Sequence, residues 1–325
     1  MTDARLLCCG LTTWDIVQVV DRMPGPDEKV QALELRAGVG GPAANAARTA
    51  VALGVRARLV TALGSGSIAE LARADLAAAG VEVVDLALGL DAGPAISTVL
   101  VTRGTGQRAV VSTNAVAAPR LHQAPDRVLD GITALLVDGH HLELAIRLAH
   151  DAHDAGIPTV LDGGSWKLGE EALLDVIQLA VVSGDFALPT ALGRRGSAAT
   201  EPGRPCPDDD AAARADLRSI ATLGPSFVAR TAGADPVRYL HRPDAHGHRS
   251  RFGQVAISPP PGPMVDTLGA GDVLHGAFAA AIAAGQTPAD ALAFATALAT
   301  ASVCHSGALG WARDPELLAQ VSLRP

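Results

Sequence analysis

The chain of 325 residues is long enough for one large α/β domain or two domains of ordinary size. Hydrophobic residues make up 48% of it and aromatic residues only 3%, so its core has to be built from Ala, Val and Leu. The net charge of −8 argues against a nucleic acid or an acidic membrane surface as the main partner, and the apolar stretch 273–284 is too short to span a bilayer.

The first third of the chain alternates buried strands with short helices. We expect a strand over residues 5–10, helices over 42–53 and 68–79, and strands over 59–63 and 81–86. Two segments with a hairpin pattern, 11–37 and 96–114, interrupt this alternation. In the first, residues 29–35 are expected to pair back on 16–20. In the second, two β-rich runs flank Arg103-Gly-Thr-Gly106, a strong turn signal.

The alternation resumes after residue 121. Strands are expected over 135–138, 159–162, 179–183, 227–230, 237–240 and 254–257, and helices over 142–155, 170–177, 211–223, 272–284, 288–301 and 315–321. Such repeated β/α alternation predicts an α/β fold with a doubly wound, mainly parallel sheet. In sheets of this kind ligands bind at the C-terminal ends of the strands, so polar residues at those ends are the first candidates for a site.

Cysteine and histidine spacing gives no metal signal. The four cysteines show neither CxxC pairs nor zinc-like spacing, and the N-terminal residues lack the layout of a secretory signal. We therefore expect reduced thiols and a cytoplasmic protein. His140 and His141, and likewise His150 and His153, form pairs without an evident third ligand, so no metal site made of protein side chains is expected.

The stretch 265–278, Val-Asp-Thr-Leu-Gly-Ala-Gly-Asp-Val-Leu-His-Gly-Ala-Phe, carries the strongest chemical signal. Gly269 and Gly271 flank Ala270, and such a turn lets successive backbone N–H groups form an anion-binding nest at the start of a helix. Asp272 falls in the first turn of that helix, where a carboxylate is placed to take the proton of an attacking hydroxyl. The alternative is a tight turn capped by Asp266, with Asp272 as an ordinary first-turn acid.

The pattern Asp-Thr-x-Gly-Ala-Gly-Asp followed by a helix of small residues resembles the C-terminal signature of the ribokinase-like (PfkB) carbohydrate kinases. This resemblance implies that Asp272 is the general base and that Gly269, Ala270 and Gly271 form the anion hole. It also implies a large kinase core from residues 1–10, 38–95 and 115–325, with a small β-sheet lid from residues 11–37 and 96–114. Neither a P-loop nor the set of protein-kinase motifs occurs in the sequence.

The segment 40–45, Gly-Gly-Pro-Ala-Ala-Asn, resembles the N-terminal signature of the same family. In that family the glycines approach the sugar and the Asn binds its hydroxyls, which here implies Gly40, Gly41 and Asn45. From the residues alone the segment also fits a simple helix-start turn. The cluster Gly38–Gly41 further invites a dinucleotide-binding interpretation, although the segment before it is polar and lacks the expected buried strand.

Two acids at strand ends complete the expected sugar site. Asp15 follows Gly10 by five residues, an arrangement that the family uses to bind sugar hydroxyls, and a carboxylate is a good acceptor for a vicinal diol. The alternative for Asp15 is a solvated loop acid. Asp138 ends the strand 135–138, where some family members place a residue that touches the substrate.

The remaining candidates lie on the nucleotide side. Lys167 follows the strand 159–162, where it either reaches phosphates or is a solvated loop residue. Thr231 and Gly233 resemble the family's small-residue turn under the ATP phosphates. Thr296 and Gly307 fall where the family closes over the adenine, and some members hold a monovalent cation there. The predicted ATP-binding residues are Lys167, Ser183, Thr231, Gly233, Thr296 and Gly307.

One segment departs from the family pattern. Many members carry Asn-x-x-Glu, whose acid helps to organise magnesium, and this chain has Ser183 and Phe186 at those two positions. We therefore expect Mg²⁺ to be held by the nucleotide phosphates and water, which this ion tolerates. A K⁺ site near Asp266 is a further expectation that the resemblance supplies.

The resemblance as a whole implies ATP-dependent phosphorylation of a hydroxyl on a small sugar, such as a ketohexose, a pentose or a sugar phosphate, and a homodimer formed through the lid. Arg103 and Arg108 of the second hairpin are candidates for binding an anionic group. Three alternatives stay open. One is a nucleoside kinase of the same fold. Another is a sugar-binding protein that has lost catalysis, which the missing Asn-x-x-Glu motif favours. The third is an oxidoreductase, which rests on Gly38–Gly41 alone.

Overall fold

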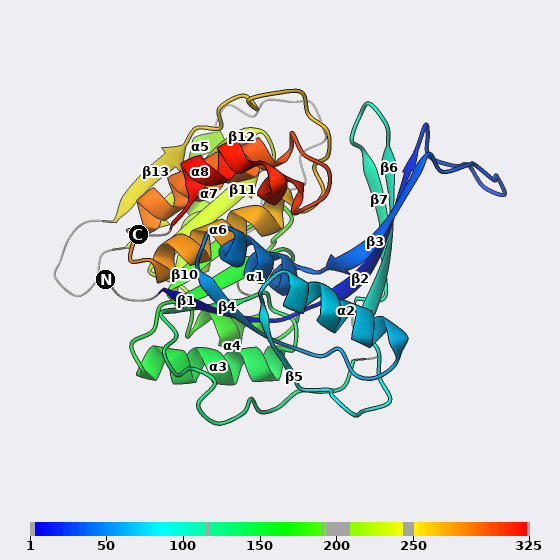
Figure 1. Ribbon diagram of the computed structural model, residues 1–325. Helices are drawn as coiled ribbons and strands as arrows, with labels where there is room; N and C mark the ends of the chain where they lie inside the picture. Colours follow the sequence, from blue (N-terminus) through cyan, green and yellow to red (C-terminus); the bar gives the residue numbers. More distant parts are fainter. Residues whose placement is uncertain (1–3, 115–117, 190–191, 193–208, 243–249, 324–325) are drawn as a thin grey trace.

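The computed structural model describes residues 4–114, 118–189, 192, 209–242 and 250–323, and they form two β-sheets with helices around the larger one (Figure 1). The larger sheet has nine described strands in the order β13-β12-β11-β10-β9-β8-β1-β4-β5. Its strands are β1 (Arg5–Cys9), β4 (Arg56–Thr61), β5 (Glu82–Asp85), β8 (Ala134–Val137), β9 (Thr159–Gly163), β10 (Leu179–Val182), β11 (Phe227–Ala232), β12 (Asp235–His241) and β13 (Arg251–Val255).

Neighbouring strands from β5 to β11 run parallel, and β12 and β13 close one edge as an antiparallel pair. The predicted α/β architecture with a mainly parallel sheet is therefore confirmed. Parallel order places the C-terminal ends of β1, β8, β9 and β10 side by side, so the polar residues that follow these strands meet at one edge of the sheet.

Helices cover both faces of the large sheet. One face carries α1 (Pro42–Ala52), α2 (Ser67–Ala78), α6 (Ala270–Ala283), α7 (Pro288–Ser302), a 3₁₀ turn (Gly310–Arg313) and α8 (Pro315–Val321). The other face carries α3 (Leu142–Asp154), α4 (Glu170–Leu174) and α5 (Asp209–Ala221) (Figure 1). Among the residues that the structure describes, no helix is both long and apolar enough to cross a bilayer.

The strand β1 shows why the sequence builds two cores. Its side chains alternate between the faces, with Leu6 and Cys8 packed under α1 and α6, and Leu7 and Cys9 packed under α3. All four side chains are fully buried, which is usual for a central parallel strand covered by helices on both sides.

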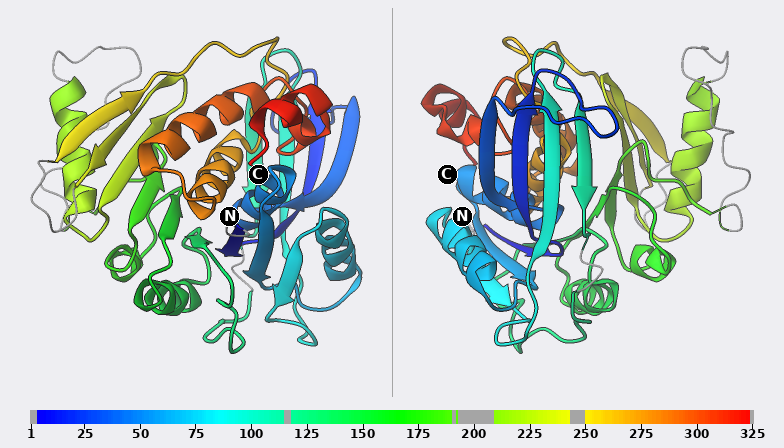
Figure 2. Two further views of the ribbon diagram at one scale, coloured as in Figure 1. Left: turned by 60° about the vertical axis from the view of Figure 1, so that its left-hand side comes forward. Right: turned by 90° about the vertical axis from the view of Figure 1, so that its right-hand side faces the viewer.

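A four-stranded sheet, hereafter the lid, stands beside the C-terminal end of β1. Its order is β3-β2-β6-β7, with β2 (Thr13–Val20), β3 (Glu34–Gly40), β6 (Ala95–Thr102) and β7 (Arg108–Ser112). The pairs β2/β3 and β6/β7 are antiparallel, and a parallel pairing of β2 with β6 joins the two hairpins into one sheet (Figure 2, right).

The expected strand over residues 29–35 was wrong, because β3 begins only at Glu34 and continues through the glycine cluster to Gly40. Gly38 and Gly40 pair with Asp15 and Thr13 of β2, since a β-ladder needs only backbone groups. The glycine cluster thus ends an antiparallel lid strand. It lacks the parallel strand–turn–helix unit that a dinucleotide-binding fingerprint requires.

Candidate active site

The helix α6 begins beside the lid with an uncapped N-terminus. Gly269 is its N-cap residue and adopts a left-handed conformation, with φ at 76°, and it makes no side-chain cap. Because the first N–H groups of a helix lack intrahelical acceptors, the turn Gly269-Ala270-Gly271 places backbone donors at the positive end of the helix dipole, and one of them, the Ala270 N–H, reaches the Thr267 backbone oxygen at 3.3 Å. This geometry suits an anion, as the sequence indicated.

Asp272 lies in the first turn of α6 and faces α1. Its Oδ2 accepts a hydrogen bond of 2.7 Å from Nδ2 of Asn45, so the two sequence motifs meet in space. Burial, followed by the nearby Asp162, raises the pKa of Asp272 to about 7, while the Asn45 hydrogen bond and His275 oppose the rise. A carboxyl group that titrates near neutral pH is well matched to taking a proton from a hydroxyl.

The Oδ1 atom of Asn45 is buried and has no partner among the described residues. Since Nδ2 of the same amide is already committed to Asp272, the unpaired oxygen is an acceptor that a hydroxyl group of a ligand would satisfy. Close packing holds this geometry: a Cβ on Gly276 of α6 would come within 2.7 Å of the Ala46 Cα in α1.

A second carboxyl, Asp162, lies behind Asp272 and pairs with His275 of α6. The Nε2 atom of His275 is 3.1 Å from the backbone oxygen of Val181, and its Nδ1 atom is 3.2 Å from Oδ1 of Asp162. Burial lowers the pKa of His275, and burial with the nearby Asp138 raises the pKa of Asp162 to about 8. The 3.2 Å contact between Nδ1 and Asp162 is a close approach rather than a hydrogen bond, because Nδ1 of His275 has no hydrogen-bond partner among the described residues.

Asp15 is a residue of the lid strand β2, and its carboxylate lies directly over Gly40. A Cβ on Gly40 would fall 1.9 Å from Oδ2 of Asp15, so any other residue at position 40 would displace this carboxylate. Gly41 has φ at 95°, and a Cβ on it would lie 2.5 Å from the Leu11 backbone oxygen. Burial raises the pKa of Asp15, while hydrogen bonds from Thr13 and Ser97 and the charge of Arg48 lower it.

Asp138 is 2% exposed and its carboxylate is occupied by backbone donors. Oδ2 accepts from the N–H groups of Leu11 (2.8 Å) and Ala43 (3.2 Å), and Oδ1 accepts from that of His140 (2.9 Å). Burial favours the neutral acid, but the charge of His140 and these hydrogen bonds hold the pKa of Asp138 well below its usual range. Asp138 therefore ties the end of β1 to the start of α1.

The predicted nucleotide residues fall into separate groups. The ends of β10 and β11 bring Ser183 and Thr231 together, since Arg230 donates to the Gly184 backbone oxygen at 2.7 Å and a Cβ on Gly184 would lie 3.6 Å from the Thr231 backbone oxygen. Gly233 is exposed in the turn that follows β11.

Lys167 is not a freely solvated loop residue. Its Nζ donates to the backbone oxygens of Asp138 and Ser165, both at 3.3 Å, and lies 3.7 Å from Oε1 of the buried Glu170. The ammonium is therefore held at the end of β8, near the carboxylates described above.

Thr296 does not join these groups through hydrogen bonds. It is 3% exposed within α7, and its hydroxyl donates to the Leu292 backbone oxygen of the same helix. The hydroxyl proton is therefore used within the helix, and the predicted ATP contact of Thr296 stays a prediction. Gly307 follows α7 and donates its N–H to Oδ2 of Asp266 at 2.9 Å, beside the start of the anion-binding turn.

Comparison with known proteins decides the family, because the model of the pfkB family of carbohydrate kinases matches residues 3–312. The chain belongs to this family. An ATP-dependent ribose-1-phosphate kinase from Halopiger xanaduensis is 29% identical over 167 residues, which cover 51% of this chain and 56% of the relative. Mouse ketohexokinase is 30% identical over 111 residues, which cover 34% of this chain and 37% of the relative.

Both alignments to these curated relatives span less than two thirds of the relatives' length. A solved structure from Agrobacterium tumefaciens, provisionally assigned as a ribokinase, superposes over nearly the whole fold. Its TM-score is 0.79 at 25% identity, and the match covers 98% of this chain and 97% of that one. The similarity therefore includes both the large sheet and the lid.

In this pfkB-family chain, the two residues that replace Asn and Glu of the Asn-x-x-Glu pattern serve the fold. Phe186 is fully buried and packs edge-on against Trp166, with ring centroids 5.6 Å apart, so the position is a core position. Ser183 donates its hydroxyl to the Gly164 backbone oxygen and receives a hydrogen bond from the Asp185 N–H. No group of three or more His, Cys, Asp or Glu side chains in the described ranges is arranged to hold a metal.

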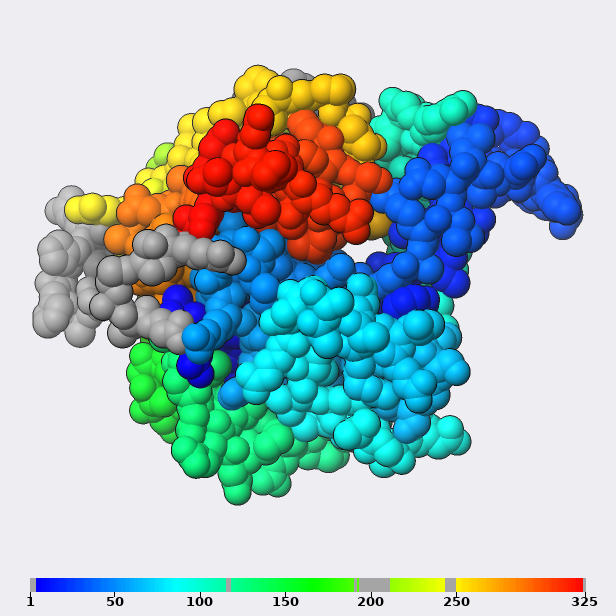
Figure 3. Space-filling view, in the orientation of Figure 1, coloured from blue at the N-terminus to red at the C-terminus, as the bar shows by residue number. Residues whose placement is uncertain are grey.

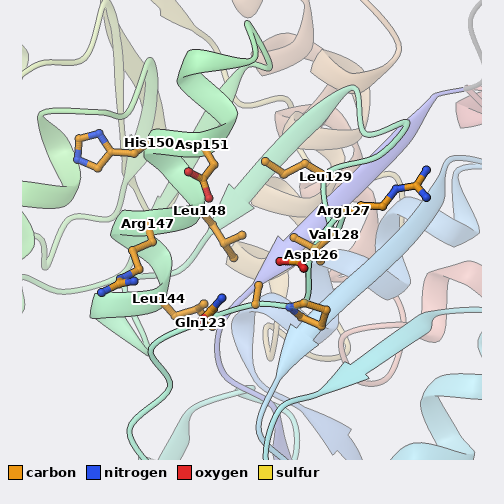
Figure 4. Close-up of a pocket in the computed structure, with 12 residues that line it drawn as sticks. Gln123, Asp126, Arg127, Val128, Leu129, Leu144, Arg147, Leu148, His150 and Asp151 are labelled. Atoms are coloured by element: carbon orange, nitrogen blue, oxygen red, sulfur yellow. The ribbon is translucent and has the colours of Figure 1, made fainter.

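Two cavities lie away from the predicted residues. One, of about 480 Å³, is formed between α3 and the segment 123–129 (Figure 4). The other, of about 510 Å³, lies between α5 and the strands β12 and β13. Neither is lined by a predicted site residue of the described chain, and the candidate site instead occupies the side of the core that faces the lid. In the space-filling view the lid projects from the core with an opening between them (Figure 3).

Sequence reasoning missed Asp162, His275 and the lid residue Arg36. The position of Asp162 at the end of a predicted strand, together with His275 three residues after Asp272, was the available signal for the first two. Arg36 contacts Asp266 across the boundary between lid and core, with an Nη2 to Oδ2 distance of 3.3 Å. No local pattern in the sequence predicts that contact.

Proposed function

We propose that this protein transfers the γ-phosphoryl group of Mg·ATP to a hydroxyl of a small sugar. The observation that carries the proposal is the pairing of Asp272 with Asn45 beside the uncapped turn Gly269–Gly271. A base poised near neutral pH, an acceptor for a second hydroxyl and a set of backbone donors then meet at one place. This combination is what hydroxyl phosphorylation needs.

The sugar would lie between the lid and α1. In this arrangement the carboxylate of Asp15 accepts sugar hydroxyls, the backbone at Gly40 and Gly41 allows close approach, and Oδ1 of Asn45 accepts a further hydroxyl. Asp138 contributes indirectly, because its carboxylate fixes the relation of β1 to α1.

The chemical step follows from the position of Asp272. As the sugar oxygen forms its bond to the γ-phosphorus, its proton passes to a carboxylate oxygen of Asp272, and the bond from phosphorus to the β–γ bridging oxygen breaks to release ADP. The N–H groups of the turn Gly269–Gly271 stabilise the charge on the moving phosphoryl group. Closure of the lid keeps water from competing with the sugar.

The nucleotide would extend from this turn along the ends of β10 and β11. In this arrangement Ser183, Thr231, Gly233 and Gly307 would contact the nucleotide, and the ammonium of Lys167, which donates to the Asp138 backbone oxygen at the end of β8, would lie near its phosphates. Mg²⁺ would arrive with the nucleotide and be held chiefly by its phosphates and water, since the described chain offers no carboxylate cluster for it.

The substrate class follows from the relatives. One is named a ribose-1-phosphate kinase and the other a ketohexokinase, so a pentose, a ketohexose or one of their phosphates is the proposed acceptor. The lid arginines do not single out a phosphate: Arg103 pairs with Asp21 at an exposed position, and Arg108 donates to Thr267. The proposed class therefore includes both free and phosphorylated sugars.

The test is ADP release from Mg·ATP across a panel of sugars, sugar phosphates and nucleosides. We expect one sugar class to give ADP, and Asp272→Ala to reduce kcat by about 10³-fold or more while sugar binding survives. Asp151→Ala is a matched control, because Asp151 is an exposed acid of α3 on the opposite face of the sheet. It should retain wild-type turnover.

Two outcomes would contradict the proposal. Substantial turnover by Asp272→Ala would remove the general base from the mechanism. Silence across the whole panel, with sugars still raising the melting temperature, would show a sugar-binding protein without catalysis.

A further inference from the structure

Asp266 connects the anion-binding turn to the segment after α7 through hydrogen bonds of its carboxylate. The residue is 4% exposed, with Oδ1 accepting from the Leu268 N–H and Oδ2 from the Gly307 N–H, both at 2.9 Å. Next to these bonds, a Cβ on Gly269 would lie 2.3 Å from the Cβ of Ala308. The start of the turn and the loop at Gly307 are therefore packed together around one buried carboxylate.

The positive charge beside this carboxylate comes from the lid. Arg36 of β3 places Nη2 3.3 Å from Oδ2 of Asp266, and its Nη1 lies 3.2 Å from where a Cβ on Gly307 would be. Arg36 also faces Glu34 at 3.2 Å, but Glu34 is largely exposed, so water screens that pair far more than the one with Asp266.

A second lid arginine reaches the same core segment. Nη1 of Arg108 in β7 lies 2.9 Å from Oγ1 of Thr267 and 3.4 Å from its backbone oxygen. The two edge strands of the lid thus each send an arginine to neighbouring residues, Asp266 and Thr267, just before the anion-binding turn. These contacts hold the lid against the part of the core that organises the turn.

The oxygens around Asp266 do not fit a monovalent cation in this arrangement. Both carboxylate oxygens already accept hydrogen bonds, and the Val303 backbone oxygen accepts from the N–H groups of Val265 and Asp266 at 2.8 and 3.1 Å. The Thr267 backbone oxygen receives the Ala270 N–H at 3.3 Å as well as Arg108. A cation such as K⁺ would have to displace a guanidinium and compete with donors already in place.

We propose that Arg36 is a positioning residue that reaches from the lid to supply the positive charge at Asp266, in place of a bound monovalent cation. The inference deepens the proposed kinase function, because it makes the shape of the Gly269–Gly271 turn depend on lid position. When the lid closes, the guanidinium balances the charge of Asp266. The carboxylate of Asp266 then keeps the Leu268 and Gly307 N–H groups in fixed positions. Turnover accordingly needs no K⁺.

The test compares the wild type with Arg36→Ala, Arg36→Lys and the control Arg103→Ala in KCl, NaCl and choline chloride at equal ionic strength. Arg103 is suited to the control role because it lies in the same lid, where its guanidinium pairs with the exposed Asp21. Three quantities are measured: kcat, the Kd for a non-hydrolysable Mg·ATP analogue by calorimetry, and the melting temperature.

We expect wild-type kcat and nucleotide Kd to agree within about 2-fold across the three salts. Arg36→Ala should lower kcat by about 10-fold or more, because the turn loses its fixed geometry. Its melting temperature should fall by about 3 °C or more, since it leaves Asp266 as an unpaired buried charge. Arg36→Lys should give an intermediate kcat and melting temperature, because a lysine keeps the positive charge but lacks the planar guanidinium group.

The proposal is overturned if K⁺ activates the wild type by more than about 5-fold over choline, or if Arg36→Ala matches Arg103→Ala in all three quantities. The melting temperature and the nucleotide Kd need no sugar turnover. If no sugar is phosphorylated, the proposed function fails on its own, and these two measurements still decide the role of Arg36.

Discussion

Replacing the proposed general base should stabilise the fold while it abolishes turnover. The pKa of Asp272 is raised from 3.8 to about 7, first by burial and then by Asp162. A raised pKa means that the folded state binds more protons than the unfolded state between these values, so stability falls as the pH rises through that window. The gap of about three units corresponds to about 4 kcal/mol at pH 8.

The side chain of Asp272 keeps partial contact with solvent, which reduces this penalty. We therefore expect Asp272→Asn, a neutral side chain of the same shape, to raise the free energy of unfolding by about 2–4 kcal/mol at pH 8. At pH 5 only about one pKa unit of the difference between folded and unfolded Asp272 contributes, so the increase in the free energy of unfolding should shrink to about 1–2 kcal/mol. The hydrogen bond from Asn45 survives, because the amide oxygen can take the place of Oδ2.

The assay is urea unfolding of wild type and variant at pH 5, 6, 7 and 8, with Asp151→Asn as a control from an exposed site. The reasoning stands if the difference grows with pH for Asp272→Asn and stays flat for Asp151→Asn. A gain that is equal at pH 5 and pH 8 would refute it, because a neutralised charge cannot act independently of pH. A variant less stable than the wild type at pH 8 would refute it as well.

Two further predictions concern the same buried acids. Below about pH 7, kcat/KM should fall with slope one, to about a tenth of its plateau at pH 6, because Asp272 must be ionised to accept the proton; a profile flat to pH 5 would contradict this. Asp162→Asn should move this fall to lower pH, because the charge of Asp162 is the second cause of the raised pKa of Asp272 and an amide removes it. A profile with an unchanged midpoint would contradict this prediction.

The elements of the fold were predictable because their signals are local. The alternation Leu6-Leu7-Cys8-Cys9 marks a strand buried on both faces, and Gly54 and Gly80 end the two helices that precede β4 and β5. The glycine turn at the start of α6 was predictable for the same reason, since its glycines and Asp272 lie within four residues, and its anion-binding role stays a prediction. The strand β3 was misplaced because its pairing uses backbone groups of Gly38 and Gly40, whose side chains carry no β signal.

The contacts that tune the site were not predictable, because they join residues far apart in the chain. Asp138 receives the Leu11 N–H across 127 positions, and Arg36 meets Asp266 across 230. Asp138 was expected to touch substrate, but its oxygens are spent on the backbone that positions α1. A carboxylate at a strand end looks the same in a sequence whether it faces a ligand or the start of a helix, and only the packed structure separates the two.

In the proposed mechanism, the segment 266–272 has the lid contact Asp266 at one end and the base Asp272 at the other. Asp266 takes its counter-charge from the lid, whereas Asp272 takes its hydrogen bond from Asn45 of the core. The backbone between them is the anion-binding turn. A lid that swings away would remove the charge at Asp266 and loosen the turn, yet it would leave Asp272 and Asn45 in contact. An open enzyme would then hold a positioned base without an organised anion hole, which suppresses phosphoryl transfer to water until a sugar has closed the lid.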